Sequence, residues 1–362
     1  MTCDRCEENR ALGAKFCSNC GEQLTDPCER CEEFRLQGAM YCPICGRRVN
    51  SYYTPVYAPK KSRIGFIFVA GLIAAAQGLL IMLVEIITGW SRYGTMSDAI
   101  DGKSYPIFII TPHIQDLFDI NDTAMRVVFI LEMITVTACF VAMILLAVNR
   151  YLKSGNDLSA LRETSAYEVP VLTGLMIFFE TVVMVIMLMA GFDFGTSDTG
   201  VSGSMMFSLL HASVYEEILS RLCMIGLPCL IVALVLRRKD SPKWKYLFGG
   251  AEYEHWMLIF VIFSATMFGL AHLDNWDTWK FFPTFVFGIL TGYVFLKYGL
   301  YATISMHFIN DYLMAGEWLC NAQAMLILGI LAVGFCTMPC LVDYAKRLWS
   351  YLKTLNSLRQ GS

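Results

Sequence analysis

The chain contains little charge and no excess of positive charge. Asp, Glu, Lys and Arg make up 16% of its 362 residues, whereas roughly a quarter of the residues in a soluble domain are charged. Hydrophobic residues reach 56%, and the formal net charge is -3. The shortage of charge excludes an ordinary soluble domain and indicates a protein surrounded mostly by lipid. The lack of a basic excess gives no support for nucleic-acid binding.

No cleavable signal sequence is expected, because residues 1–63, which precede the first apolar run, are polar and rich in cysteine. Cysteine occurs in two settings. Eight of the 14 cysteines lie in the first 45 residues, in four C-x-x-C pairs, and the other six are scattered through apolar segments. Within apolar segments a free cysteine behaves as a small hydrophobic residue. Only the amino-terminal cysteines therefore indicate metal or redox chemistry.

Residues 1–48 contain a repeat with a period of 25, and each unit reads C-x2-C-x10-C-x2-C. Four thiolates at this spacing suit a tetrahedral structural zinc ion. Each unit is too short to have a core, so the metal would supply its folding free energy. We predict two zinc ions, one in each set of four cysteines. The two sets are Cys3, Cys6, Cys17 and Cys20, and Cys28, Cys31, Cys42 and Cys45.

This head resembles the double zinc ribbons found in many bacterial proteins. A disulfide-bonded extracellular module is the alternative, but the regular C-x-x-C pairs and the missing signal sequence argue against it. Residues 1–48 carry seven Lys or Arg against eight Asp or Glu, so no basic stripe is available for phosphates. We therefore expect the head to contact a protein partner or to regulate the membrane part.

Residues 64–345 are predicted to form a membrane domain, between a proline-containing basic linker at 49–63 and a cytoplasmic tail at 346–362. Apolar runs predict about eight transmembrane helices, because around 20 residues cross the hydrocarbon layer. The fold class is therefore an all-α polytopic membrane protein with a small double zinc ribbon. The expected spans are residues 64–87, 127–148, 169–190, 205–236, 256–273, 281–296, 300–315 and 324–342, with a kink in the fourth at Gly226-Leu-Pro228.

The positions of basic and aromatic residues predict the orientation in the bilayer. Lys and Arg gather in alternate loops, so the positive-inside rule places both termini in the cytoplasm. All seven tryptophans lie at or beyond the ends of the expected helices, as they do in interfacial belts. A cytoplasmic location also agrees with reduced, zinc-loaded cysteines. We expect an integral protein of a bacterial plasma membrane.

Polar residues on the fourth predicted helix form the motif E-E-x-x-x-R. Glu217 and Arg221 are four residues apart, so they share a helix face and can pair. Glu216 lies about 140° around the helix from Arg221, which leaves its carboxylate free while Glu217 is neutralised. A free carboxylate beside a paired one is the arrangement that a general base requires. A structural ion-pair network would give the same motif.

Two further motifs place histidines in apolar segments. Phe268 precedes His272 by one helical turn and can form an apolar wall over it, and His307 and Asp311 are again four residues apart. Ionisable groups in hydrocarbon are costly and mark functional sites by default. Glu216, His272, His307 and Asp311 can hold a divalent metal ion that leaves a position for water. They can equally activate water without a metal.

Other polar residues in the membrane domain have less specific interpretations. His211 is expected to pack or to form a local hydrogen bond, because it lies about 140° around the helix from Glu216. Glu180 is either a second layer of the site or a protonated helix contact. Glu85 and Glu132 lie nearer the ends of their helices and are expected to reach water.

At these residues the chain resembles the CAAX-protease and bacteriocin-processing family of intramembrane proteases (CPBP, also called Abi). The family motifs are E-E-x-x-x-R, F-x-x-x-H, and H-x-x-x-N or H-x-x-x-D. The resemblance covers about residues 200–315, and the head is an accessory. The residues that carry it are Glu216, Glu217 and Arg221, then Phe268 and His272, then His307 and Asp311.

The resemblance implies a helical core of about eight spans and a peptidase. Glu216 and His272 would activate water, and His307 with Asp311 would stabilise the oxyanion or bind metal. The better-known form of the motif has Asn where this chain has Asp311. An ionised Asp cannot donate a hydrogen bond to an oxyanion, so Asp311 favours a metal ligand unless it is protonated or Asn310 replaces it. A membrane-associated peptide or protein is the expected substrate.

Two other functions use the same residues. In a non-catalytic binding or immunity protein, the polar cluster would be a structural network. A proton-coupled transporter would use Glu180 with the carboxylate–histidine cluster, but the inverted repeats expected of a transporter are not detected. An intramembrane endopeptidase is the interpretation that we carry forward.

Overall fold

The computed structural model describes residues 65–192, 202–238, 240–274, 278–312 and 334–350, together with four single positions in the head. The chain divides into two units, Met1–Arg63 and Ile64–Ser362. The eight amino-terminal cysteines lie outside the described residues, so the two zinc sites stay predictions. The description that follows concerns the second unit.

The second unit is helical, and six helical segments of its described part are long and apolar enough to cross a membrane. Their outward faces carry large hydrophobic side chains such as Leu131, Leu145 and Leu188, as expected where the surroundings are lipid. The predicted all-α polytopic membrane fold is confirmed. The segments are α3 (Phe66–Ser91), α5 (Asp122–Lys153), α6 (Ser165–Met189), the continuous α7–η2–α8 (Gly203–Val235), α10 with η3 (Met257–Asp274), and η4 with α11 (Thr278–Tyr298).

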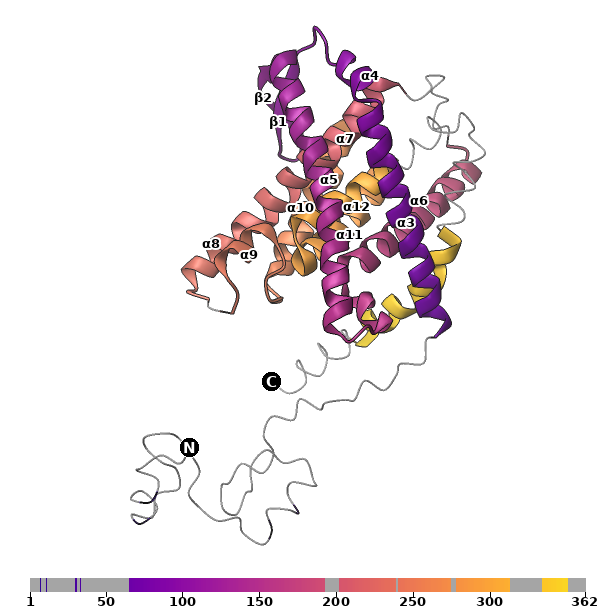
Figure 1. Ribbon diagram of the computed structural model, residues 1–362. Coiled ribbons are helices and arrows are strands. Elements are labelled where there is room, and N and C mark those ends of the chain that lie inside the picture. Colours follow the sequence, from indigo (N-terminus) through magenta and orange to yellow (C-terminus); the bar gives the residue numbers. More distant parts are fainter. Residues whose placement is uncertain are drawn as a thin grey trace. The chain divides into compact units, whose positions relative to one another are not determined.

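Two of the eight predicted spans are described only in part. The seventh corresponds to α12 (Leu300–Tyr312). The eighth, predicted at 324–342, overlaps a helix that the structure describes over residues 334–350. A count of about eight spans is compatible with these segments. In Figure 1, α12 lies within the bundle between α5, α6 and α10, and most of its described side chains are buried.

The fourth span changes its winding in mid-membrane. Helix α7 (Gly203–Glu217) passes into a π-helix, η2 (Ile218–Gly226), and then into α8 (Leu227–Val235). Pro228 has no amide hydrogen for an α-helical bond, and the wider π turns end just before it. The predicted kink at Gly226-Leu-Pro228 thus takes the form of a π segment, a feature that is frequent at functional sites.

A β-hairpin departs from the all-α prediction. Strands β1 (Tyr105–Ile110) and β2 (Ile114–Ile120) pair antiparallel between the short helix α4 (Tyr93–Asp98) and α5. Their β-branched and aromatic residues on either side of a Thr-Pro-His turn are typical of strands. Each strand is too short to form the long apolar run from which the transmembrane helices were predicted.

The remaining short elements connect the spans. They are η1 (Leu158–Glu163), which follows α5, α9 (Lys243–Phe248), η3 (His272–Asp274), which closes α10, and η4 (Thr278–Lys280), which leads into α11 (Phe281–Tyr298).

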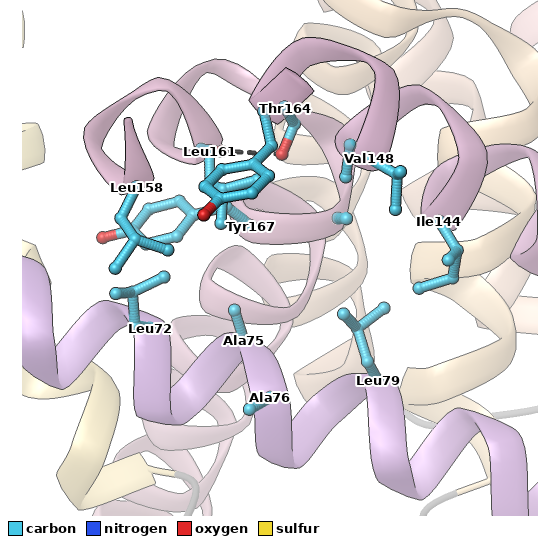
Figure 2. A pocket seen from close by; sticks show the side chains of 13 residues that line it. Leu72, Ala75, Ala76, Leu79, Ile144, Val148, Leu158, Leu161, Thr164 and Tyr167 are labelled. Atoms are coloured by element: carbon cyan, nitrogen blue, oxygen red, sulfur yellow. Dashed lines mark hydrogen bonds between the residues drawn. The ribbon is translucent and has the colours of Figure 1, made fainter. Parts of the chain in front are cut away.

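Helices α3, α5 and α6 also surround an apolar cavity of about 360 Å³, shown in Figure 2. Leu72, Leu79 and Tyr167 are among the residues that line it, and none of the lining residues is charged. A cavity of this composition suits hydrocarbon and offers no group for hydrolysis. The polar residues of the membrane domain gather instead where α7, η2, α10 and α12 meet.

Candidate active site

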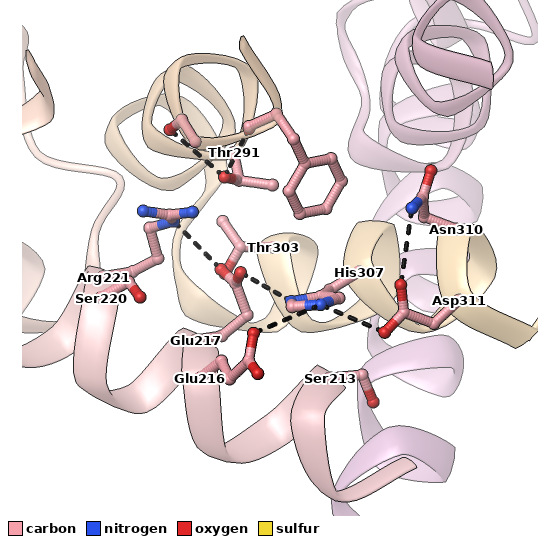
Figure 3. Close-up of polar contacts among 12 residues, drawn as sticks. Ser213, Glu216, Glu217, Ser220, Arg221, Thr291, Thr303, His307, Asn310 and Asp311 are labelled. Carbon is pink, nitrogen blue, oxygen red and sulfur yellow. Dashed lines mark hydrogen bonds and ion pairs between the residues drawn. The ribbon is translucent and has the colours of Figure 1, made fainter. Parts of the chain in front are cut away.

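The three sequence motifs meet at the junction of α7, η2, α10 and α12 (Figure 3). Glu216 and Glu217 are the last residues of α7, where the helix begins to widen, and Arg221 lies in the π-helix. His307 and Asp311 lie on α12. The change of winding therefore occurs at the glutamate pair itself.

Glu217 is the centre of the cluster and has no exposed surface. Its Oε2 atom lies 3.2 Å from Nε of Arg221, and its Oε1 atom lies 2.9 Å from Nδ1 of His307. The carboxylate neutralised by arginine can only accept, so Nδ1 of His307 carries a proton and donates it to Glu217. This bond fixes the orientation of the imidazole and leaves Nε2 facing the opposite side.

Arg221 is also completely buried, and its remaining contacts lie on α10. Its Nη1 atom donates to Oγ of Ser264 at 2.8 Å, and its guanidinium carbon lies 5.2 Å from the centre of the Phe268 ring. Ser264 in turn donates to the backbone carbonyl of Ser220 at 2.6 Å. A buried charge is tolerated only when it is paired and hydrogen-bonded. The ion pair of Arg221 and Glu217, together with their bonds to Ser264 and His307, therefore links α7 and η2 to α10 and α12.

The Nε2 atom of His307 faces two carboxylates that are more accessible. It lies 3.3 Å from Oδ2 of Asp311 and 3.9 Å from Oε2 of Glu216. The side chains of Glu216 and Asp311 are 21% and 19% exposed, against 0% for Glu217. Glu216 accepts no hydrogen bond from a described residue. The cluster thus has a closed side with one buried, ion-paired carboxylate and an open side with two accessible carboxylates.

His272 lies at the end of α10, at the first position of η3. Its Nδ1 atom lies 2.8 Å from the carbonyl oxygen of Phe268. A carbonyl only accepts, so Nδ1 carries the proton and Nε2 holds a lone pair in the neutral ring. The ring centres of Phe268 and His272 are 4.6 Å apart, and the Phe268 ring also meets His307 edge-on at 6.1 Å. The Phe268 ring therefore contacts both histidines.

The structure brings together five of the six predicted site residues through direct contacts: Glu216, Glu217, Arg221, His307 and Asp311. His272 joins them through Phe268, and no ion pair links it to Glu216 in the described part of the chain. The fifth predicted span continues past residue 273 as η3, which carries His272.

The geometry gives little support to a catalytic metal ion. No group of three or more His, Cys, Asp or Glu side chains in the described ranges is arranged to hold one. Glu216 and Asp311 are turned toward His307 and not toward a shared ligand position (Figure 3). The side chains predicted to bind such a metal do not converge on one position in this arrangement. They are Glu216, His272, His307 and Asp311.

Two polar partners of the site were missed from the sequence. Ser264 precedes Phe268 by one turn and extends the F-x-x-x-H motif to S-x-x-x-F-x-x-x-H, which would have been a usable signal. Thr303 lies beside Glu217 in Figure 3, one turn before His307. Such a hydroxyl in an apolar helix gives no signal of its own, because it can bond within its own helix.

The expectations for the other acidic residues were partly wrong. Glu85 and Glu132 were expected to reach water but are only 3% and 5% exposed. Glu132 lies 2.7 Å from Nδ1 of His211, so His211 forms a hydrogen bond to another helix. Glu180 forms no hydrogen bond or ion pair with another described residue, and its two interpretations stay open.

Comparison with known families agrees with this arrangement. Residues 199–313 match the family described as type II CAAX prenyl endopeptidase Rce1-like, and residues 3–46 match the double zinc ribbon. The first match includes all six predicted site residues, and the second includes all eight amino-terminal cysteines. No curated protein and no solved structure matches the chain. The matches support an integral membrane protease whose substrate is a peptide in the membrane, with structural zinc in the head.

Proposed function

We propose that this chain, with its Rce1-like domain, is an intramembrane endopeptidase that hydrolyses a peptide bond in a membrane-associated peptide or protein. The observation that carries the proposal is the contrast between the two adjacent glutamates. Glu217 is completely buried between Arg221 and His307, while Glu216 is accessible and accepts no hydrogen bond from a described residue. A general base needs a free lone pair within reach of water.

The proposed first step is the activation of a water molecule on the open side of the cluster. Glu216 takes a proton from this water, and Nε2 of His272 offers a second acceptor, because Nδ1 of that ring is held as a donor. The resulting hydroxide attacks the scissile carbonyl. The proton held by Glu216 is then delivered to the leaving amine, so that no net proton is consumed by the site.

His307 stabilises the oxyanion in this proposal. Its two ring nitrogens face Glu217 and Asp311, and a ring held between two carboxylates is stabilised in its doubly protonated form. The Nε2–H group of such a ring can donate to the oxyanion. Asp311 then acts by keeping that proton on Nε2. This role suits an aspartate at position 311, where a direct donor would have to be an asparagine.

Cleavage assays with the full chain in lipid vesicles test the proposal. The substrates are a farnesylated C-a-a-X peptide, chosen from the name of the matched family, and an unprenylated transmembrane peptide. We expect Glu216→Gln and His272→Ala to abolish cleavage while the protein stays folded. Glu163→Gln, an exposed carboxylate paired with Arg150, is the matched control. Wild-type rates in both site variants would refute the peptidase.

A non-catalytic binding or immunity protein is the second candidate, and the buried Glu217–Arg221–Ser264 network favours it. Such a protein needs the network only for its fold. It predicts that a stably folded Glu216→Gln variant keeps the cellular phenotype. Loss of the phenotype in that variant would exclude it.

We also propose an orientation with both termini in the cytoplasm of a bacterial cell. Alternate loops rich in Lys and Arg support it. Labelling of a single cysteine placed at residue 2 or 360 with a membrane-impermeant thiol reagent in whole cells would test this orientation, since reaction without lysis would contradict it.

A further inference from the structure

The β1–β2 hairpin contacts both elements that carry the proposed water-activating residues. It lies between α4 and α5 along the chain, and Figure 1 shows it beside the end of α5. Nothing in the proposed chemistry uses it. Among the described residues, its hydrogen bonds to the helices that carry Glu216 and His272 lie at two positions, one next to each of these residues.

The first attachment is Tyr215, the residue immediately before Glu216. Its hydroxyl donates to the carbonyl oxygen of Phe108 in β1 at 2.7 Å, and the two rings meet edge-on with centres 5.0 Å apart. The Tyr215 ring also stacks on His211, with ring centres 5.0 Å apart. His211 is itself held by Glu132 of α5. Tyr215 is therefore held by the hairpin and by a neighbouring ring.

The pairing of the two strands is irregular beside this attachment. The register shifts between Ile107 and Phe108 of β1, and the extra residue of this bulge is Leu117 of β2. A bulge bends the strand and changes the direction of its groups, and bulges are common beside active sites. Here the residue after the shift supplies the carbonyl that accepts from Tyr215.

The second attachment is Asp274, two residues after His272. Its Oδ2 atom accepts from the backbone amide of Ile114 at 2.7 Å, and its Oδ1 atom accepts from Nδ1 of His113 at 2.9 Å. Both donors belong to the end of the turn and the start of β2. One carboxylate thus uses both of its oxygens to hold the tip of the hairpin against η3.

We propose that the hairpin is a brace that sets the position of Glu216 relative to His272, with Tyr215 and Asp274 as its positioning residues. This inference rests on the proposed peptidase function. Glu216 and His272 belong to different helices and form no ion pair with each other, so their alignment depends on what joins those helices. The Arg221–Ser264 bond joins them on the buried side. The hairpin joins them at the ends that carry the reacting groups.

A brace should affect the rate of the chemical step and not the binding of substrate. Misplacement of a catalytic group by about 1 Å can cost on the order of 100-fold in rate. We expect Tyr215→Phe and Asp274→Ala each to lower kcat by about 10- to 100-fold with KM unchanged. Asp274→Asn should recover part of the rate, because its remaining oxygen can still accept from Ile114. The double variant should be little slower than the worse single variant, since both attachments serve one alignment.

Matched controls remove hydrogen bonds near the hairpin whose partners are not in α7 or η3. Tyr105→Phe removes a hydroxyl that donates to the backbone of Ala99 and keeps the ring that packs on Phe207 of α7, and Asp122→Ala, at the start of α5, removes a carboxylate that accepts from the amide of Gly102. We expect both to keep the wild-type kcat. A loss in the controls equal to that in Tyr215→Phe and Asp274→Ala, or a rise in KM alone, would overturn the brace.

Hydrogen–deuterium exchange of the full chain gives a readout that does not depend on activity. In Asp274→Ala we expect faster exchange at the amide of Ile114 and also in the peptide that contains Tyr215, because the two attachments share one hairpin. Unchanged exchange around Tyr215 would overturn the brace even if activity falls. If instead Glu216→Gln still cleaves at the wild-type rate, the proposed role of Glu216 fails while the exchange result stands. If Glu216→Gln abolishes cleavage but Tyr215→Phe and Asp274→Ala keep the wild-type kcat, the brace alone is refuted.

Discussion

Arg221 and Ser264 are joined by a hydrogen bond of 2.8 Å between Nη1 and Oγ, and this bond links the π-helix of the fourth span to α10. Both residues have no exposed surface. The guanidinium thus serves two partners, since it also pairs with Glu217. A buried arginine with this role is a structural support for the carboxylate next to the proposed base.

Replacement of Arg221 by Gln should destabilise the protein strongly. It leaves the carboxylate of Glu217 buried without a cation, and removal of one partner of a buried pair typically costs about 3–5 kcal/mol. Chemical denaturation in detergent, followed by tryptophan fluorescence, measures the change. Arg150→Gln removes an arginine from the exposed pair with Glu163, where the expected cost is about 0–1 kcal/mol. Equal losses in the two variants would contradict the buried role of Arg221.

Asp311 should act through His307, and its variants can separate this role from direct donation. Asp311→Ala removes the acceptor 3.3 Å from Nε2 of His307. If His307 then loses the Nε2 proton, kcat should fall by up to about 100- to 1,000-fold, the typical cost when an oxyanion donor is lost. Asp311→Asn keeps an oxygen for Nε2 and should fall between Ala and wild type. The steady-state kcat of the three proteins on one substrate tests this. An Asn variant faster than wild type would show that residue 311 donates directly.

Relationships within one helix were predictable from the sequence. The spacing of Glu217 and Arg221 predicted an ion pair, and the structure has one at 3.2 Å. The ion-pair prediction succeeds because residues four apart lie on one helix face whatever the surroundings are. Glu216, one residue earlier, was predicted to be left free, and its Oε2 atom lies 3.9 Å from Nε2 of His307, so its role as a base stays a prediction.

Relationships between elements were not predictable in the same way. The bond from His211 to Glu132 crosses from α7 to α5, and the link from Ile114 to Asp274 spans 160 residues. Periodicity carries no information about which helices become neighbours. Glu132 was expected to reach water because its distance from a helix end was judged along the sequence, whereas its burial depends on α7 packing over it.

Glu168 should be the main polar support at the other end of the membrane domain. It is 1% exposed and accepts from the hydroxyls of Tyr293 at 2.8 Å and Tyr344 at 3.2 Å. It also contacts Lys297 and Tyr298. Glu168→Gln removes the charge that accepts these hydrogen bonds and leaves the partly exposed Lys297 ammonium without its counter-charge, so we expect a loss of about 1.5–3 kcal/mol in the free energy of unfolding.

Thermal unfolding in detergent measures the effect of Glu168→Gln, with Glu163→Gln, an exposed carboxylate at the end of η1, as the control. Glu168 lies on α6 and Tyr344 on the helix at 334–350, so the loss should be accompanied by faster hydrogen exchange in that carboxy-terminal helix. A variant as stable as wild type would show that the tyrosine hydroxyls and Lys297 find other partners.

The zinc content of the head can be tested one ribbon at a time. The match of residues 3–46 to the double zinc ribbon supports two zinc ions per full chain, each held by four thiolates. Cys28→Ser should remove one zinc ion and leave one, because each set of four cysteines closes its own site. Cys139→Ser, a buried cysteine of α5, should leave two. Metal analysis of the purified full chain gives the ratio, and a Cys28→Ser protein that retained two zinc ions, or lost both, would contradict two independent sites.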